Sequence, residues 1–131
     1  MAESQKSPDA PQIRPGFAFH YETDDHLFFV ASDFAQPDVL ILSFTTVRKF
    51  SDRSCVIQPG EHPFVKVETC VAYNFAELQP SGAILEGIAR GTIVPYAPLT
   101  PELMNRIWDG ASVTRHLPLK CRDLLNRQGL T

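Results

Sequence analysis

The segment from residue 45 to residue 53, TTVRKFSDR, gathers side chains that could bind a phosphate backbone. Two hydroxyls are followed by the densest positive stretch of the chain, with one aromatic ring among the cations: Thr45, Thr46, Arg48, Lys49, Phe50 and Arg53. Cations and hydroxyl donors can hold RNA phosphates, and the ring can stack on a base. The alternative is that the loop cations are only solvated and that the threonine pair reflects ordinary β-propensity.

Four histidines supply side chains that titrate near physiological pH: His20, His26, His62 and His116. They form no HxH or HxxxH pair, so their spacing does not predict a metal site. A metal site built from His26, His62, Cys55 and Cys70 would depend on the fold to bring these residues together, and we do not predict one. His116 stands just before the last predicted helix and is expected on the surface.

His62 lies in the stretch PGEHPF, between two apolar segments. Pro59 and Gly60 favour a turn, and Pro63 biases His62 itself toward an extended backbone. A turn residue constrained in this way is well placed to present a functional imidazole. The favoured interpretation is structural: the ring hydrogen-bonds to a nearby backbone group and closes the loop.

Composition limits the classes of function. The 131 residues are 44% hydrophobic and 21% charged, enough for one core, and the net charge of −3 excludes a general positive field for nucleic acid. An RNA contact would need a local basic patch. The three cysteines have no CxxC spacing and are expected to be reduced and buried. No apolar run approaches the ~18 to 20 residues of a membrane span, so we expect a cytoplasmic protein with no membrane contact.

The apolar pattern predicts the elements that would position these residues. Residues 1–14 are polar and contain two prolines, which predicts a flexible arm before a single domain over residues 15–131. Alternating or continuous apolar runs predict β-strands over residues 17–21, 26–32, 38–46, 54–58 and 64–78. The turn signals in DFAQPD favour an antiparallel hairpin between the second and third of these strands.

After residue 78 the apolar period becomes helical. Helices are predicted over residues 81–91, 100–110 and 118–127; the second has Thr100 as N-cap, Pro101 in the first turn and Gly110 as its stop. Strands first and helices afterwards predict a mainly β, α+β fold: a small antiparallel barrel or strongly bent sheet, capped by two or three C-terminal helices.

The stretch RPGFAFHYETDDHLFFVASDFAQPDVLILSFTT resembles the opening of the PemK/MazF-like toxins, which have an SH3-like barrel. Pro15-Gly16, the run over residues 28–32 and the run over residues 39–46 match the family's strands, and VETCVAYNFAELQP is similar to a later strand. The similarity covers roughly residues 14–91. It implies a homodimeric endoribonuclease, independent of metal and cofactor, that is paired with an antitoxin protein and cuts RNA by attack of a ribose 2′-OH.

The resemblance also implies site residues. Thr45 and Thr46 occupy the family's hydroxyl-bearing position, but His26 stands where the family usually has an arginine, and Asn74 stands where an aspartate or glutamine is common. Because an asparagine cannot transfer a proton, an active nuclease would use His26 or His62, with Thr46, as its catalytic groups. A weakened or repurposed barrel is equally consistent, and the alternative function is a non-catalytic SH3-like module that binds a protein partner.

Overall fold

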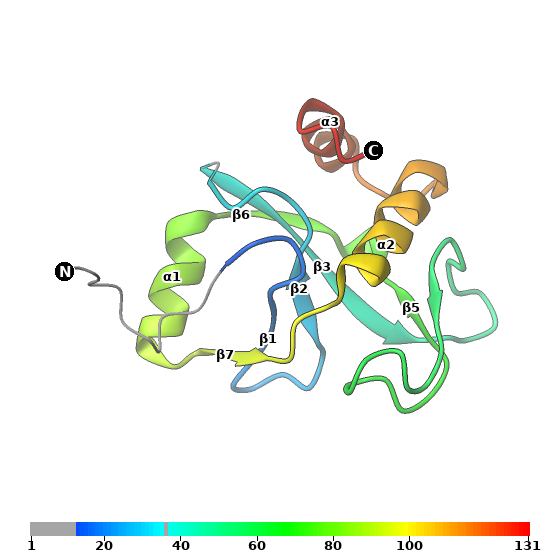
Figure 1. Cartoon of the computed structure of the whole chain (residues 1–131), viewed down its shortest axis with the longest axis horizontal. Coiled ribbons are helices and arrows are strands. Elements are labelled where there is room, and N and C mark those ends of the chain that lie inside the picture. The colour runs from blue at the N-terminus through cyan, green and yellow to red at the C-terminus, as the bar shows by residue number, and fades with distance from the viewer. Residues whose placement is uncertain (1–12, 36) are drawn as a thin grey trace.

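The computed structural model describes residues 13–35 and 37–131, so nearly all of the arm predicted over residues 1–14 lies outside the described residues. The described chain forms an α+β fold (Figure 1). Its strands are β1 (Ala18–Tyr21), β2 (Phe28–Val30), β3 (Asp38–Thr46), β4 (Val56–Ile57), β5 (Thr69–Val71), β6 (Glu77–Pro80) and β7 (Ile93–Tyr96). Its helices are the 3-10 turn η1 (Tyr73–Phe75), α1 (Ser81–Arg90), α2 (Pro101–Val113) and α3 (Leu119–Arg127).

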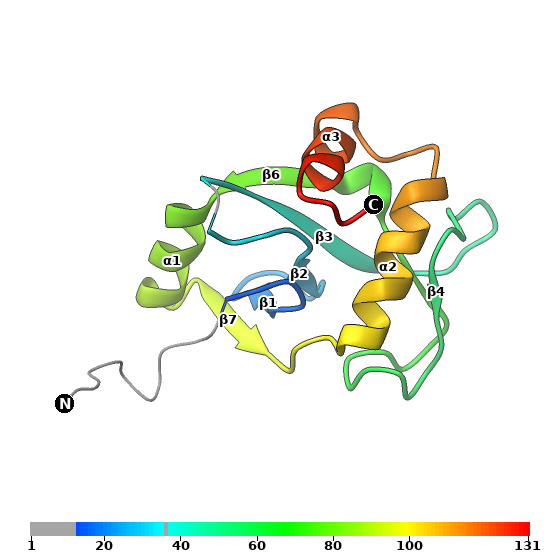
Figure 2. The ribbon, with the colours of Figure 1, turned by 45° about the horizontal axis from the view of Figure 1, so that its top comes forward.

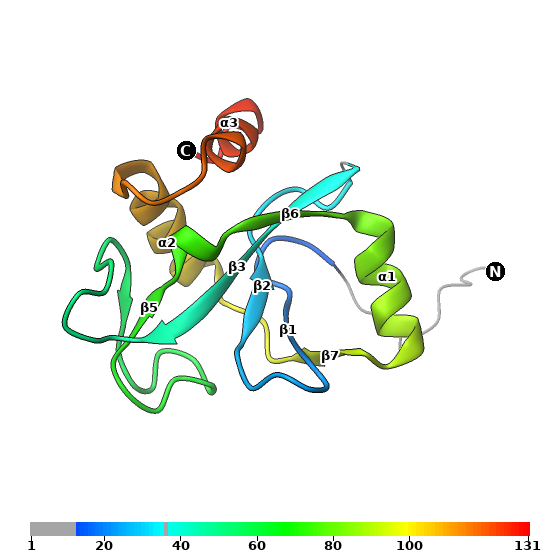
Figure 3. The ribbon, with the colours of Figure 1, turned by 180° about the vertical axis from the view of Figure 1, so that it is seen from behind.

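Strand β3 is the centre of the sheet. One edge pairs with β2, and the other pairs first with β6 and then, toward the C-terminal end of β3, with β5 (Figure 3). All of these pairings are antiparallel, and the predicted β2–β3 hairpin is confirmed. Both faces of β3 are covered: Leu40, Leu42 and Phe44 pack into one core, and Val39 and Ile41 pack into a second. Since both faces are buried, the strand is a continuous apolar run.

The predicted α+β class with an antiparallel sheet is confirmed, but a closed barrel is not. The strand order is β4-β5-β3-β2-β1-β7, with β6 also on β3, and the sheet stays open at its two ends. The edge strand β7 was not predicted, so the order of strands first and helices afterwards was wrong at this point. Pro95 argued against a strand here, because proline lacks an N–H donor. An edge strand tolerates proline, however, because it pairs with a neighbour on one side alone.

The segment predicted as one strand over residues 64–78 is divided. Strand β5 ends at Val71, the turn η1 follows, and β6 resumes the pairing with the first half of β3. A 3-10 turn repeats every three residues, so the two-residue alternation fails there. Tyr73 is buried while Phe75, at the same parity, is exposed.

The three α-helices cover the sheet from different ends. Helix α1 lies at the opposite end of the molecule from β4, whereas α2 and α3 lie together (Figure 2). The predicted N-cap of α2 is confirmed, since the Thr100 hydroxyl accepts a hydrogen bond of 3.1 Å from the Leu103 N–H. The predicted stop at Gly110 was wrong, because the helix continues to Val113. Among the described residues, none of the helices has both the length and the apolar character that a membrane span requires.

Candidate functional site

The C-terminal end of β3 lies between two concavities. The larger has a volume of about 430 Å³ and the smaller about 220 Å³, and Thr45, Thr46 and Arg48 line both of them. The pairing of β3 with β5 places Thr45 opposite Cys70 and Thr46 opposite Thr69. It therefore fixes the backbone positions of these two hydroxyl-bearing residues. The predicted hydroxyl and guanidinium groups are therefore brought together.

His26 lines the smaller concavity with these three residues. Its Nδ1 lies 2.7 Å from Oδ1 of Asp24, and the same oxygen accepts the His26 backbone N–H at 2.8 Å. These hydrogen bonds lower the pKa of Asp24, so the carboxylate is ionised and can only accept. Nδ1 of His26 therefore carries a proton, and in the neutral ring the lone pair lies on Nε2. An imidazole held in this tautomer is suited to accept a proton.

Two hydrogen bonds between Arg48 and Ser51 close the loop that follows β3. The Arg48 N–H donates to the Ser51 hydroxyl at 2.7 Å, and the Ser51 N–H donates to the Arg48 carbonyl at 3.2 Å. Within the part of the chain that the structure describes, neither Arg48 nor Lys49 forms an ion pair. Both cations are exposed and line the larger concavity, whereas Arg53 is exposed but lines neither. Arg48 and Lys49 are thus available to an anionic ligand.

The larger concavity contains residues that the sequence did not single out together. Phe50 lines it as part of the predicted cluster, and it is joined by Asp52, Asn74, Phe75 and His116. The predicted surface exposure of His116 is confirmed, but its place beside Thr45 and Arg48 was missed. No local signal could have found it, because His116 lies far along the sequence from the other residues that line this concavity.

Asp52 connects the loop after β3 to the segment that carries His116. It accepts hydrogen bonds from the Ser54 N–H at 2.9 Å, the Ser54 hydroxyl at 2.6 Å and the Thr114 hydroxyl at 2.5 Å. The Thr114 oxygen also accepts the His116 backbone N–H at 3.1 Å. Partial burial acts to raise the pKa of Asp52, but the Ser54 and Thr114 hydrogen bonds outweigh it and lower the pKa.

His62 lines neither concavity. Its side chain is buried, with Nε2 at 2.8 Å from the Ala97 carbonyl and Nδ1 at 3.1 Å from the Phe64 N–H. Because Nδ1 accepts, Nε2 carries the proton and donates, and both ring nitrogens are occupied. This geometry supports the structural interpretation of His62, in which the ring joins its turn to the segment before α2. Among the described residues, no group of three or more histidine, cysteine, aspartate or glutamate side chains could hold a metal ion.

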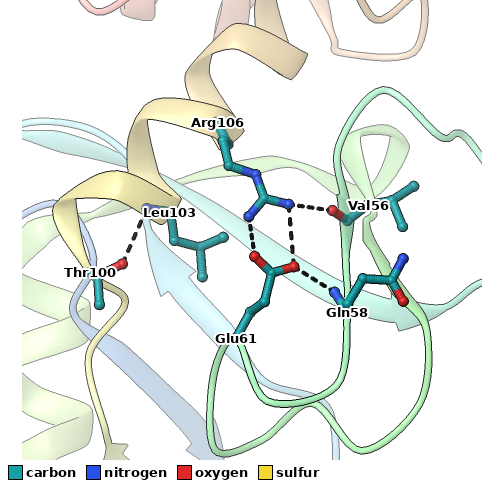
Figure 4. A network of polar contacts seen from close by, with 6 residues as sticks. All are labelled: Val56, Gln58, Glu61, Thr100, Leu103 and Arg106. Atoms are coloured by element: carbon teal, nitrogen blue, oxygen red, sulfur yellow. Dashed lines mark hydrogen bonds and ion pairs between the residues drawn. The ribbon is translucent and has the colours of Figure 1, made fainter.

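A second set of contacts holds the turn that contains His62 (Figure 4). Arg106 of α2 pairs with the Glu61 carboxylate and donates to the Val56 carbonyl at 2.6 Å. The Glu61 carboxylate also accepts the Gln58 N–H at 2.7 Å. The hydrogen bond from Arg106 is the main reason that the pKa of Glu61 is lowered. The turn is therefore fixed to α2 as well as to Ala97.

The lowered pKa of Asp52 predicts that the free energy of unfolding falls in acid. Its ordinary pKa is 3.8, and a lower pKa in the folded state means that the unfolded chain binds more protons in this range. The stabilisation is therefore complete above about pH 4 and is lost as the pH falls through the lowered value. Asp52→Asn should reduce the free energy of unfolding by about 1–2 kcal/mol at pH 7.

Urea unfolding between pH 7 and pH 3 measures this effect. Asp52→Asn should also show a shallower loss of stability below pH 4 than the parent chain. The exposed Asp123→Asn is the matched control, and equal curves for the two variants would contradict the assignment.

Comparisons with known proteins identify no relative. No protein-family model matches this chain, and searches of curated proteins and of solved structures find no match either. The resemblance to the PemK/MazF-like toxins therefore stays a prediction, and the proposal for function starts from the geometry at the end of β3.

Proposed function

We propose that this protein is a PemK/MazF-like toxin-type endoribonuclease that cuts RNA without a metal ion. One observation carries the proposal: His26, oriented by Asp24, shares a concavity with Thr45, Thr46 and Arg48. A proton acceptor can activate a ribose 2′-OH, and two hydroxyl donors and a guanidinium can stabilise the phosphate charge, while solvent supplies the proton of the leaving oxygen. His62 has no part in this site, because backbone groups occupy both of its ring nitrogens.

The proposed reaction uses Nε2 of His26 as the base. Nε2 takes the proton of the 2′-OH, the 2′ oxygen bonds to phosphorus, and the bond from phosphorus to the 5′ oxygen breaks. The departing oxygen takes a proton from solvent, to which the imidazolium later returns one. One fragment then ends in a 2′,3′-cyclic phosphate and the other begins with a 5′-OH. Arg48 and the threonine hydroxyls bind the non-bridging oxygens, where negative charge grows.

The proposed enzyme also has an SH3-like parent architecture and a protein partner. The antiparallel order of β1, β2 and β3 and the wrapping of β5 and β6 along β3 support an SH3-like barrel as the parent architecture. We infer a cytoplasmic homodimer that a protein antitoxin neutralises by covering the end of β3. Light scattering that gives a monomer at micromolar concentration would remove the dimer from the proposal.

A non-catalytic interaction module is the second candidate, and a separate groove favours it. This groove of about 820 Å³ lies between the segment before β1, the end of β7 with the segment that follows it, and α2. Its lining includes Tyr96, Pro98, Pro101 and Trp108. Aromatic and proline side chains of this kind form the grooves that bind extended peptides. Asn74, which cannot transfer a proton, is also consistent with a barrel that has lost catalysis.

Cleavage of a mixed RNA pool in EDTA tests the proposal. We expect fragments ending in 2′,3′-cyclic phosphate, resistance of a substrate with a 2′-deoxy sugar at the cut site, and growth arrest when the chain is expressed. Arg48→Ala should slow cleavage by about 100-fold and relieve the arrest. Arg90→Ala is the matched control, because it also removes an arginine, but one that lies on α1 and pairs there with Glu86. Normal growth together with an intact RNA pool would contradict the nuclease and favour the interaction module.

A further inference from the structure

We infer that the larger concavity is a subsite for one unpaired nucleobase of single-stranded RNA, held between the rings of Phe50 and Phe75. The inference rests on the proposed function, because it names the part of the RNA that the same surface holds. The occupant is a base in a single strand, since the faces of paired and stacked bases in a duplex are not open to side chains.

The exposure of the two rings is the first observation. Phe50 is 90% exposed and Phe75 is 73% exposed, the highest values among the large apolar side chains of the described chain. The other seven phenylalanines are buried or half-buried. An exposed ring gives up the stabilisation of burial, so two such rings on the rim of one concavity indicate a binding surface.

The second observation is that the turn carrying Phe75 is anchored to α2. In η1, Tyr73 points into the core, and its hydroxyl donates to the Ile107 carbonyl of α2 at 2.6 Å. The next two side chains, Asn74 and Phe75, are turned outward and line the concavity. Because the backbone at Phe75 is already fixed, it loses little conformational freedom when a base stacks on the ring.

The charges around the rings fit a nucleic acid strand. Nζ of Lys49 lies 5.4 Å from the centroid of the Phe50 ring, and Arg48 lines the same concavity, so phosphates on either side of a bound base would meet cations. Asn74 offers an amide donor and acceptor to the edge of the base. Asp52 also lines the concavity, but its carboxylate is already occupied by hydrogen bonds from Ser54 and Thr114.

The size of the concavity is adequate for a base. Its volume of about 430 Å³ falls within the range of roughly 300 to 1,000 Å³ that is usual for small-molecule sites. The position is also suitable, because Thr45, Thr46 and Arg48 line this concavity and the one that contains His26. A base held here would place the neighbouring phosphate at the end of β3.

A fluorescence titration tests the subsite without relying on cleavage. The probe is a 2′-O-methyl RNA strand carrying 2-aminopurine, which has no free 2′-OH and cannot be cut. We expect binding with quenching of the 2-aminopurine, and dissociation constants raised roughly 5- to 150-fold by Phe50→Ala and by Phe75→Ala. Leu119→Ala is the matched control, since it removes a 72% exposed apolar side chain outside the concavity and should leave the affinity unchanged.

Three outcomes would overturn the subsite: equal affinity for a duplex of the same sequence, unchanged affinity in both phenylalanine variants, or a dimer that dissociates when Phe75 is replaced. The last outcome, measured by light scattering, would assign the rings to an interface between copies. A chain that cuts RNA but shows any of these results loses the subsite alone. A chain that binds the probe as expected but never cuts RNA loses the nuclease alone.

Discussion

Replacing His26 with alanine is expected to slow RNA cleavage by about 10²- to 10⁴-fold, the usual contribution of a positioned acid–base group. Of the described residues that line the smaller concavity, His26 alone carries an imidazole, and in the proposed reaction Thr45, Thr46 and Arg48 bind the phosphate there. Asp24 holds the opposite nitrogen, so the lost function is proton transfer from the 2′-OH. Binding of an uncleavable RNA should change little, because the phosphate contacts remain.

Single-turnover cleavage of a defined RNA measures the effect. His20→Ala is the matched control: it removes a second partly exposed histidine, whose Nδ1 contacts the Tyr21 carbonyl at 3.0 Å and which lines neither concavity. The His26 side chain is 62% exposed, so its removal should leave the melting temperature nearly unchanged. Equal cleavage rates for the two variants would exclude His26 as the base.

The sequence predicted those parts of the fold that depend on neighbouring segments. The β2–β3 hairpin follows from two apolar runs with a turn between them, and α2 follows from Thr100, Pro101 and a helical stripe. Strand β7 depends on a long-range pairing with β1, and Pro95 hides it from any local rule. The division of β5 from β6 by η1 reflects a tertiary contact of Tyr73 with α2, which an alternating pattern does not contain.

The candidate site also has a part that neighbouring segments predict and a part that depends on long-range contacts. Thr45, Thr46 and Arg48 are nearly adjacent in the chain, so their proximity was predictable, and the β2–β3 hairpin brings His26 to them. The contribution of His116 to the same surface depends on the Asp52 to Thr114 hydrogen bond, which joins two segments far apart in sequence. The partner of His62, the Ala97 carbonyl, is 35 residues away in the sequence, so the residues next to His62 do not distinguish its two roles.

Gly110→Ala is expected to lower the free energy of unfolding by about 2 kcal/mol. This is the opposite of the stabilisation that alanine usually gives inside a helix. Helix propensity alone favours alanine by about 1 kcal/mol. A Cβ at this position, however, would lie 2.8 Å from the Ser54 carbonyl oxygen and 2.9 Å from Cβ of Cys55, and would collide with the Tyr73 hydroxyl. Inserting a methyl group into such a packed contact costs roughly 1–3 kcal/mol or more, so crowding outweighs propensity.

Urea unfolding of Gly110→Ala beside Gly82→Ala measures this difference in one experiment. Gly82 lies on the exposed side of α1, where an added Cβ would meet no atom within 4 Å beyond its chain neighbours and its own helix backbone. Its replacement should therefore stabilise the fold by up to about 1 kcal/mol. The cost at Gly110 should shrink in a Tyr73→Phe background, because the colliding hydroxyl is gone. Stabilisation by both substitutions would mean that α2 does not pack this closely on Tyr73. Since Tyr73 anchors the turn that carries Asn74 and Phe75, the same result would also remove the rigid support on which the nucleobase subsite depends.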